Sequence, residues 1–173
     1  MEKTNPMHEI RIEKVTLNIG AGKNQDVLKK GLKLLKNITN GVPITTITQK
    51  RLPAWGLRPG LPIGCKITLR KKRAFDIVPR LLEARTNTLK EDNFDQHGNV
   101  SFGIHEYIDI GGIKYDPEIG IMGLQVCVTL ERPGFRIKRR SDKKTVGKKQ
   151  SITKEQSMIY FKKKFNVRVG EEE

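Results

Sequence analysis

The stretch "IRIEKVTLNIG", residues 10–20, indicates the fold class because apolar and polar side chains alternate along it. Alternation with a period of two predicts a β-strand that buries one face and exposes the other. The apolar side carries Val15, Leu17 and Ile19, and the polar side carries Thr16 and Asn18.

Other stretches repeat this alternation. They are "CKITLR" (65–70), "VSFGIHEYI" (100–108) and "LQVCVTL" (124–130), and "ITTIT" (44–48) predicts a shorter strand. In the first of them Cys65, Ile67 and Leu69 point inward, and the residues that point outward are Lys66, Thr68 and Arg70. The polar sides of these strands share a composition of hydroxyl, amide and cationic groups.

Three stretches have the period of a helix. Residues 26–39 place Leu28, Leu32, Leu35 and Thr39 on one face, and Asn24 or Asp26 could cap the helix. Residues 74–85 also read as a helix, in which Pro79 either introduces a kink or lies near the start. Residues 153–165 begin with a Thr-x-x-Gln capping box and predict the last helix.

These elements predict an α+β fold with a mainly antiparallel sheet, helices on one face and an open polar and basic face. A doubly wound parallel sheet would need strands that are apolar on both sides. We expect one domain, residues 1–173, in which 132–173 form a basic C-terminal extension that ends in a helix. The open face is expected to contain no carboxylate and to carry Thr16, Asn18, Lys66, Thr68, Arg70, Gln125 and Thr129.

Charge is distributed unevenly along the chain, which has a net charge of +15. Residues 27–75 contain 12 basic residues and no acidic ones, whereas residues 76–131 contain ten acidic and four basic ones. Residues 132–169 contain 14 basic and two acidic residues. Segregation of this kind indicates a polyanionic partner, usually nucleic acid. We expect no membrane partner, because no basic amphipathic helix with an aromatic apolar face occurs.

The only tryptophan lies in a long projecting loop, "QKRLPAWGLRPGLPIG", residues 49–64. Its prolines restrict the unfolded chain, so less entropy is lost when the loop is ordered. Trp55 could stack on a nucleotide or brace the loop, and the alternative is a hydrophobic plug folded back on the sheet. The candidate contact residues of the loop are Lys50, Arg51, Trp55 and Arg58.

The sequence offers no arrangement for catalysis. "NIGAGK" at 18–23 lacks the spacing of a phosphate-binding loop, and the three histidines and two cysteines form no metal-ligand pattern. We therefore expect no enzymatic activity, no metal and no cofactor. Cys65 and Cys127 are expected to be reduced thiols, and the N-terminal residues have no signal-peptide pattern, so a cytoplasmic location is expected.

Four segments together resemble successive signature segments of the large-subunit ribosomal protein five family, a universal 5S-rRNA-binding family. They are "RIEKVTLNIGAG" (11–22), "LRPGLPIGCKITLR" (57–70), "FDQHGNVSFGIHE" (94–106) and "YDPEIGIMGLQV" (115–126). They occur in the family's order, and the resemblance covers most of the chain. The basic stretch 132–156 resembles the archaeal and eukaryotic branch.

The resemblance implies a structural constituent of the large ribosomal subunit. It implies binding to 5S rRNA and large-subunit rRNA, beside neighbouring 5S-rRNA-binding ribosomal proteins. The family's polar RNA contacts fall on Asn18 and Thr68, and a third, a Gln, falls on Gly41, for which Asn40 is the candidate substitute. With their strand neighbours, the expected 5S rRNA-binding residues are Thr16, Asn18, Asn40, Lys66, Thr68 and Arg70.

The resemblance also implies contacts outside 5S rRNA. The 49–64 loop is expected to reach the peptidyl-site tRNA. Like charge along residues 136–149 of the extension predicts that this stretch alone is disordered by self-repulsion and that rRNA phosphates order it. Its rRNA-binding residues are Arg136, Lys138, Arg139, Arg140, Lys143, Lys144, Lys148 and Lys149.

An acidic region is expected to form an intersubunit bridge with a basic small-subunit head protein. The family's bridge surface corresponds to "IDIGGIKYDPEIG", residues 108–120, with Asp109, Asp116 and Glu118 as candidate contacts. The alternative is ordinary solvation of an acidic loop.

Two other functions remain open from the sequence. A free-standing RNA-binding regulator or RNA chaperone would use the same sheet face but would give the tryptophan loop and the acidic region no role. An RNA-modifying enzyme would need acid, base, metal or cofactor residues that the sequence does not show. Sedimentation with the large subunit through a salt wash distinguishes a ribosomal protein from a free regulator.

Overall fold

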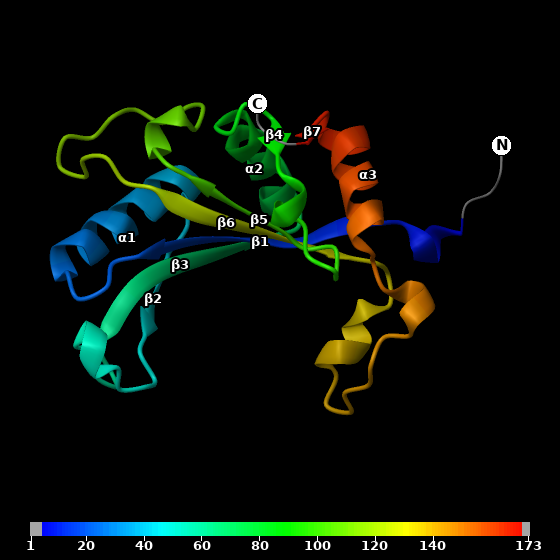
Figure 1. Cartoon of the computed structure of the whole chain (residues 1–173), viewed down its shortest axis with the longest axis horizontal. Helices are drawn as coiled ribbons and strands as arrows, with labels where there is room; N and C mark the ends of the chain where they lie inside the picture. The colour runs from blue at the N-terminus through cyan, green and yellow to red at the C-terminus, as the bar shows by residue number, and fades with distance from the viewer. Residues whose placement is uncertain (1–4, 171–173) are drawn as a thin grey trace.

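The computed structural model describes residues 5–170, which form a five-stranded antiparallel sheet with three α-helices (Figure 1). The strand order is β2-β3-β1-β6-β5. The strands are β1 (Arg11–Gly20), β2 (Ile44–Ile47), β3 (Pro62–Arg70), β5 (Val100–Ile104) and β6 (Leu124–Glu131). This architecture confirms the expected α+β class.

Helices cover one side of the sheet only. Figure 1 shows α1 (Gln25–Thr39) and α2 (Lys72–Glu83) above the strands, and no α-helix of the described residues below them. The third helix, α3 (Lys154–Phe165), lies beyond the end of the sheet where β1 begins. A short parallel pair, β4 (Thr88–Leu89) with β7 (Arg168–Val169), joins the C-terminal part of the chain to the segment after α2.

The alternation of the strands produces the core between the sheet and the helices. Most inward side chains of β1, β3 and β6 are buried, and the buried Cys65 is a free thiol among them. The desolvated environment raises the pKa of Cys65 to about 11, so this thiol stays neutral.

Helix α1 packs on the sheet with a different face from the one expected. Leu32 and Thr39 are only half-buried, and the buried residues are Leu28, Gly31, Leu34, Leu35 and Ile38. The shift has a steric cause at Gly31, where an added Cβ would lie 2.9 Å from the Cys65 Sγ. Because glycine has no side chain, the helix can approach β3 closely. Glycine is also not counted as apolar when the buried face of a helix is predicted from its large apolar residues.

Of the two positions left open for Pro79, the structure has the one inside the helix, α2. Two expected boundaries differ from the structure. The strand expected over 100–108 ends at Ile104, because Tyr107 turns into the core and begins a 3₁₀ turn, Tyr107–Asp109. The projecting loop ends earlier than residue 64, since β3 already begins at Pro62.

The last part of the chain is folded onto the core. The Thr153–Gln156 capping box is present at the start of α3, as predicted. Phe161 of this helix is fully buried and meets the Phe94 ring at 6.0 Å between centroids. The helical end of the extension is therefore packed on the core, whereas nearly every residue of 136–149, the stretch expected to be ordered by rRNA, is exposed.

Within residues 5–170, no helix has both the length and the apolarity that crossing a membrane requires. The same residues bring together no group of three or more His, Cys, Asp or Glu side chains that could hold a metal ion.

Candidate RNA-binding face

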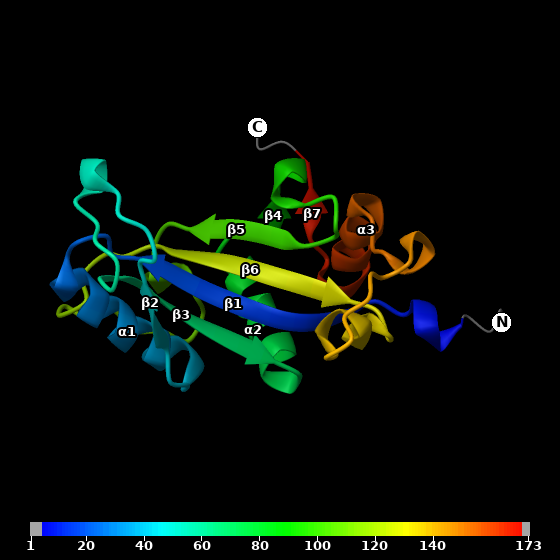
Figure 2. The ribbon, with the colours of Figure 1, turned by 90° about the horizontal axis from the view of Figure 1, so that it is seen from below.

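The side of the sheet without helices carries polar rows that cross three strands. Directly opposite residues of antiparallel strands point to the same side. The rows on β3, β1 and β6 are Lys66–Asn18–Gln125, Thr68–Thr16–Cys127 and Arg70–Lys14–Thr129. Five of the six residues expected to bind 5S rRNA therefore share this surface, which we call the open face (Figure 2).

A hydrogen bond orients the amides of one row. The Asn18 Nδ2 donates to the Gln125 Oε1 at 3.2 Å. The side-chain amide oxygen of Asn18 can still accept a hydrogen bond from a ligand, and the side-chain amino group of Gln125 can still donate one. The pair thus presents an acceptor and a donor side by side, which suits the edge of an unpaired base or a ribose hydroxyl.

A hollow of about 390 Å³ adjoins this pair at the end of β1. Its lining includes Asn18, Gln125, His105 and two glycines of the neighbouring strand ends, Gly20 and Gly103. An added Cβ at Gly20 or Gly103 would meet no atom within 4 Å, so the space is open at both positions. The sequence contains only one sign of this hollow, the glycine that interrupts the alternating "VSFGIHE", which can mark a close approach to the backbone.

The opposite end of the open face contains carboxylates, which corrects the expectation of none. The strand register shifts between Ile12 and Lys14, and the intervening Glu13 lies 3.3 Å from an Arg70 guanidinium nitrogen. Arg139 contacts Glu13 at 2.6 Å and Glu131 at 3.2 Å. The strict alternation of inward and outward residues does not predict this, because one extra residue in β1 moves Glu13 out of phase with the rest of the strand.

This ion-pair cluster changes the roles of two predicted RNA contacts. Arg70 and Arg139 each have a carboxylate partner, so part of their charge is already balanced within the protein. In these pairs the arginine side chains are about half-exposed and the two glutamate side chains are largely buried. The cluster attaches the start of the extension to the end of the sheet.

Asn40 is separated from the other five residues. It is the C-cap of α1, with a left-handed φ of 50°, and its backbone N–H donates to the Lys36 carbonyl. It borders a hollow with Leu69, on the helix side of β3, and with Arg73 of α2. Asn40 is therefore not part of the open face.

The tryptophan loop projects away from the sheet as an arm, residues 48–61. Hydrogen bonds from Thr48 to Leu61 and from Gly60 to Thr48 close its base, and a Leu52–Leu57 bridge closes its tip. Trp55 is 67% exposed, so it is not a plug folded onto the sheet.

The arm brings its four predicted contact residues together as exposed side chains, Lys50, Arg51, Trp55 and Arg58. Lys23, which follows β1, adds a cation that the sequence analysis did not include. A Cβ built on Gly56 would overlap the Lys23 Nζ, so Lys23 rests against the tip of the arm.

The basic extension forms a second projection on the same side. Figure 1 shows the arm and the segment around the 3₁₀ turn Phe135–Arg139 below opposite ends of the sheet. Of the eight predicted cations in this extension, Arg139 contacts Glu13 at 2.6 Å and Lys144 contacts Asp142 at 3.5 Å. The other six have no ion pair within the described residues. The open face therefore lies between two cationic projections.

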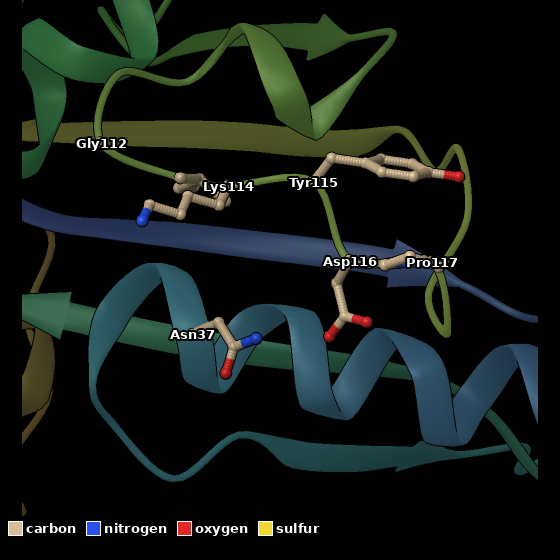
Figure 3. Close-up of a pocket in the computed structure, with 7 residues that line it drawn as sticks. Asn37, Gly112, Lys114, Tyr115, Asp116 and Pro117 are labelled. Atoms are coloured by element: carbon tan, nitrogen blue, oxygen red, sulfur yellow. The ribbon is translucent and has the colours of Figure 1, made fainter.

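The predicted bridge residues lie on the other side of the molecule. Asp109 is exposed, whereas Asp116 and Glu118 form ion pairs with Lys33 of α1, at 2.8 Å for Asp116. Figure 3 shows the Asp116 carboxylate directed toward α1 across a hollow of about 360 Å³ that Asn37 and residues 112–117 line. A lysine on a surface helix gives no sign in the sequence that it pairs with residues more than 80 positions away.

The ion pair between Lys33 and Asp116 shifts the pKa of both groups. Hydrogen bonds to Asp116 and Glu118 raise the pKa of Lys33 to about 12, and the hydrogen bond from Lys33 lowers the pKa of Asp116. The loop is also fixed from the core, because the Asp116 N–H donates to the buried Tyr107 hydroxyl at 3.0 Å. The acidic region is thus a structured surface with part of its charge offset.

An uncovered polar face between two cationic projections defines a class of protein, one whose surface binds a polyanion such as RNA. Comparison with known sequences gives the family. Residues 5–58 match the family model described as "Ribosomal protein L5", and residues 62–160 match the model that describes the C-terminus of the same ribosomal protein family.

Archaeal relatives match over nearly the whole chain. Three of them, each named large ribosomal subunit protein uL5, come from Sulfurisphaera tokodaii, Methanosphaera stadtmanae and Nanoarchaeum equitans. They are 44%, 44% and 45% identical, over 98%, 95% and 95% of this chain and 97%, 99% and 98% of their own. The chain belongs to the ribosomal protein L5 family, in its archaeal form, and is a non-enzymatic ribosomal protein.

Proposed function

We propose that the protein, as a structural constituent of the large ribosomal subunit in the cytoplasm, binds 5S rRNA through the open face. The observation that carries this proposal is the register that places Thr16, Asn18, Lys66 and Thr68 together on an uncovered surface. Hydroxyl and amide groups on a sheet can recognise 2′-hydroxyls and base edges, whereas cations alone recognise phosphate charge.

The position of the open face supports selectivity over simple charge attraction. Its centre is formed by the neutral side chains of Thr16, Thr68, Asn18 and Gln125. The cations lie at its margins and on the two projections. Such an arrangement lets phosphate contacts position the RNA while the neutral groups distinguish its sequence or shape.

The arm is proposed to contact the peptidyl-site tRNA. This proposal is supported by the exposed indole of Trp55 at the tip, with Arg51 and Arg58 in the same arm. An aromatic ring with adjacent cations can stack on a base and bind its phosphates, and stacking is worth about 1–3 kcal/mol per base. The prolines of the arm limit the entropy lost on binding.

The exposed part of the extension is proposed to bind large-subunit rRNA. Arg136, Arg140 and Lys143 are among its exposed cations, and Asp142 is the one acid between them. Neighbouring 5S-rRNA-binding ribosomal proteins are the partners proposed for this assembly.

The acidic region is proposed to take part in an intersubunit bridge with a basic small-subunit head protein. Lys33 offsets part of the charge of Asp116 and Glu118, and Asp109 remains exposed in the same region. The pairing of two carboxylates with one lysine leaves a net negative surface that is held in a defined shape. Opposite charge on a partner favours its approach to this side.

The proposal is tested most simply at Thr68. Thr68→Ala removes a hydroxyl from the centre of the open face and leaves the net charge unchanged. We expect affinity for 5S rRNA to fall by about fivefold to tenfold, the worth of one neutral hydrogen bond, with affinity for a random RNA of equal length unchanged. Binding is measured by filter retention or fluorescence anisotropy at one fixed salt concentration.

Thr45→Ala is the matched control, because Thr45 pairs with Cys65 and so points to the other side of the same sheet. It is expected to leave both affinities unchanged. Equal losses on the two RNAs, or equal losses in the two variants, would reject the open face as the selective surface.

A further inference from the structure

A groove on the side of the molecule away from the open face takes no part in the function proposed above. It has a volume of about 840 Å³ and lies where the N-terminal segment, the start of α2 and the side of α3 meet. Its lining combines the cations Arg11, Lys71, Lys163 and Lys164 with apolar side chains. We call it the α3 groove.

Apolar side chains are exposed along the α3 groove. Ile159 is 63% exposed and Phe75 is 41% exposed, on α3 and α2 respectively. Ile10 and Ile12, from the segment that enters β1, continue the same surface and are half-buried. Large apolar groups gathered in a hollow and rimmed by charge are typical of a protein interaction site.

One of the four cations of the α3 groove is paired, because Arg11 contacts Glu131 at 3.0 Å. Lys71, Lys163 and Lys164 have no carboxylate partner within residues 5–170, and Glu9 is the one acid in the lining. The buried Arg132, which also lines the groove, donates to the Gln156 Oε1 at 2.9 Å and to two backbone carbonyls. An occupant therefore meets three lysines that have no carboxylate partner among the described residues, beside exposed apolar side chains.

The aromatic rings of the groove already have ring or cation contacts within the protein. Phe75 packs against Phe165 at 5.7 Å between centroids, and the Lys164 Nζ lies over the Phe75 ring at 5.8 Å. Tyr160 makes edge contacts with Phe161 and Phe165 at 5.9 and 6.3 Å. RNA-binding surfaces use open aromatic faces, so the apolar component here suits aliphatic side chains better than nucleobases.

From these contacts we infer that the α3 groove is a docking site for an acidic, amphipathic helical segment of a partner protein. Aliphatic residues on one side of that helix pack against Ile159, Phe75 and the half-buried isoleucines. Carboxylates along its flanks pair with Lys71, Lys163 and Lys164. This is the helix-in-groove mode, in which apolar anchors give affinity and charges fix orientation.

The test uses a synthetic peptide of about 14 residues, four helical turns, with leucines on one face and glutamates on its flanks. Its partner is a scrambled peptide with the same composition and charge but no apolar face. We expect the amphipathic peptide to bind saturably with a Kd below about 1 mM, and the scrambled peptide at least about tenfold more weakly. Binding persists when the open face is filled with 5S rRNA, which separates this result from the proposed function.

Matched variants on α3 locate the site. Ile159→Ser and Lys163→Glu are expected to weaken peptide binding by about fivefold to tenfold, and Lys162→Glu by less than about twofold. Lys162 is exposed on the same helix but does not line the groove. Amide chemical shifts of the wild-type protein are expected to move at α3 and at the start of α2, which tests the site without any variant.

Three results would overturn the inference. The first is no saturable binding of the amphipathic peptide. The second is equal loss in Lys162→Glu and Lys163→Glu, or equal binding of the scrambled peptide, because either would mean attraction by net charge alone. The third is displacement of the peptide by a single-stranded oligonucleotide whose own binding is lost in Ile159→Ser, which would assign the groove to RNA.

Discussion

At the scale of single residues, pairing decides which charged side chains are available to a partner. Arg139 and Arg140 are adjacent, yet only Arg139 reaches the carboxylates of Glu13 and Glu131. Lys33 likewise differs from the other lysines of α1, because it holds Asp116 and Glu118. Residue type alone would have assigned the same role to each member of these sets.

The Lys33–Asp116 pair gives a prediction for pH. The lowered pKa of Asp116 means that its contribution to stability is present above the ordinary aspartate pKa and is lost as the pH falls through the lowered value. The raised pKa of Lys33 makes its contribution present below pH 10.5 and lost as the pH rises through about 12.

Lys33→Gln removes the charged donor that lowers the Asp116 pKa and leaves at most a neutral amide in its place, so we expect that pKa to rise toward the ordinary value of 3.8. The measurement is an NMR titration of the Asp116 side-chain carboxyl. Lys29→Gln, on the same helix but without contact to Asp116, is the control and should leave the titration unchanged. An unaltered Asp116 pKa in both variants would show that Lys33 does not hold this loop.

At the scale of elements, the strands were predictable and their exceptions were not. The alternation of β1, β3 and β6 follows from one buried and one exposed face, and this is a property of each strand alone. The bulge at Glu13 depends on the partner strand, and the buried face of α1 depends on a sulfur of β3 against Gly31. Both exceptions arise from contacts between distant segments, and the periodicity of a single segment does not predict such contacts.

The close approach of α1 to the sheet predicts that a larger residue at Gly31 destabilises the protein. Gly31→Ala improves helix propensity by about 1 kcal/mol. The added Cβ lies 2.9 Å from the Cys65 Sγ, so overpacking should dominate and lower the free energy of unfolding by about 1–3 kcal/mol in urea denaturation.

The double variant Gly31→Ala/Cys65→Ala is the check on this explanation. Removal of the sulfur relieves the overlap, so the combined loss should be smaller than the sum of the two single losses. Strict additivity would place the cause of the destabilisation elsewhere.

The arm carries its own reporter, because Trp55 is the only tryptophan of the chain. Its exposure predicts an emission maximum typical of indole in water. Binding of tRNA is expected to quench or shift this emission, and Trp55→Ala should weaken the complex by about 1–3 kcal/mol if one base stacks on the ring. Unchanged emission at saturating tRNA would contradict a contact through the tip of the arm.

At the scale of the whole molecule, the fold sorts functions onto different sides. The polar open face and its two cationic projections share one side, and the acidic region and the α3 groove lie away from it. The sequence predicted the polar strand residues and the separation of charge. It did not place Asn40 on the helix side or reveal the hollow beside Asn18, because both depend on how distant segments meet.

Charge balance across the molecule predicts how binding responds to salt. Each cation that neutralises a phosphate contributes a slope of about 0.7–0.9 to the fall of log affinity with log salt concentration. Arg140→Gln should therefore reduce the slope for rRNA by about that amount, and Arg139→Gln by less, because Glu13 and Glu131 already balance Arg139. Equal changes in the two variants would mean that the ion pairs are exchanged for phosphates on binding.

Whether the open face selects 5S rRNA is decided by a comparison of two RNAs. Affinity of the wild-type protein is measured for 5S rRNA and for a random RNA of the same length, across a salt series that includes physiological salt. We predict a preference for 5S rRNA that persists as the salt concentration rises, because neutral hydrogen bonds are less screened than phosphate contacts. Equal affinities that decline together would contradict selection by the open face and leave only charge as the basis of binding.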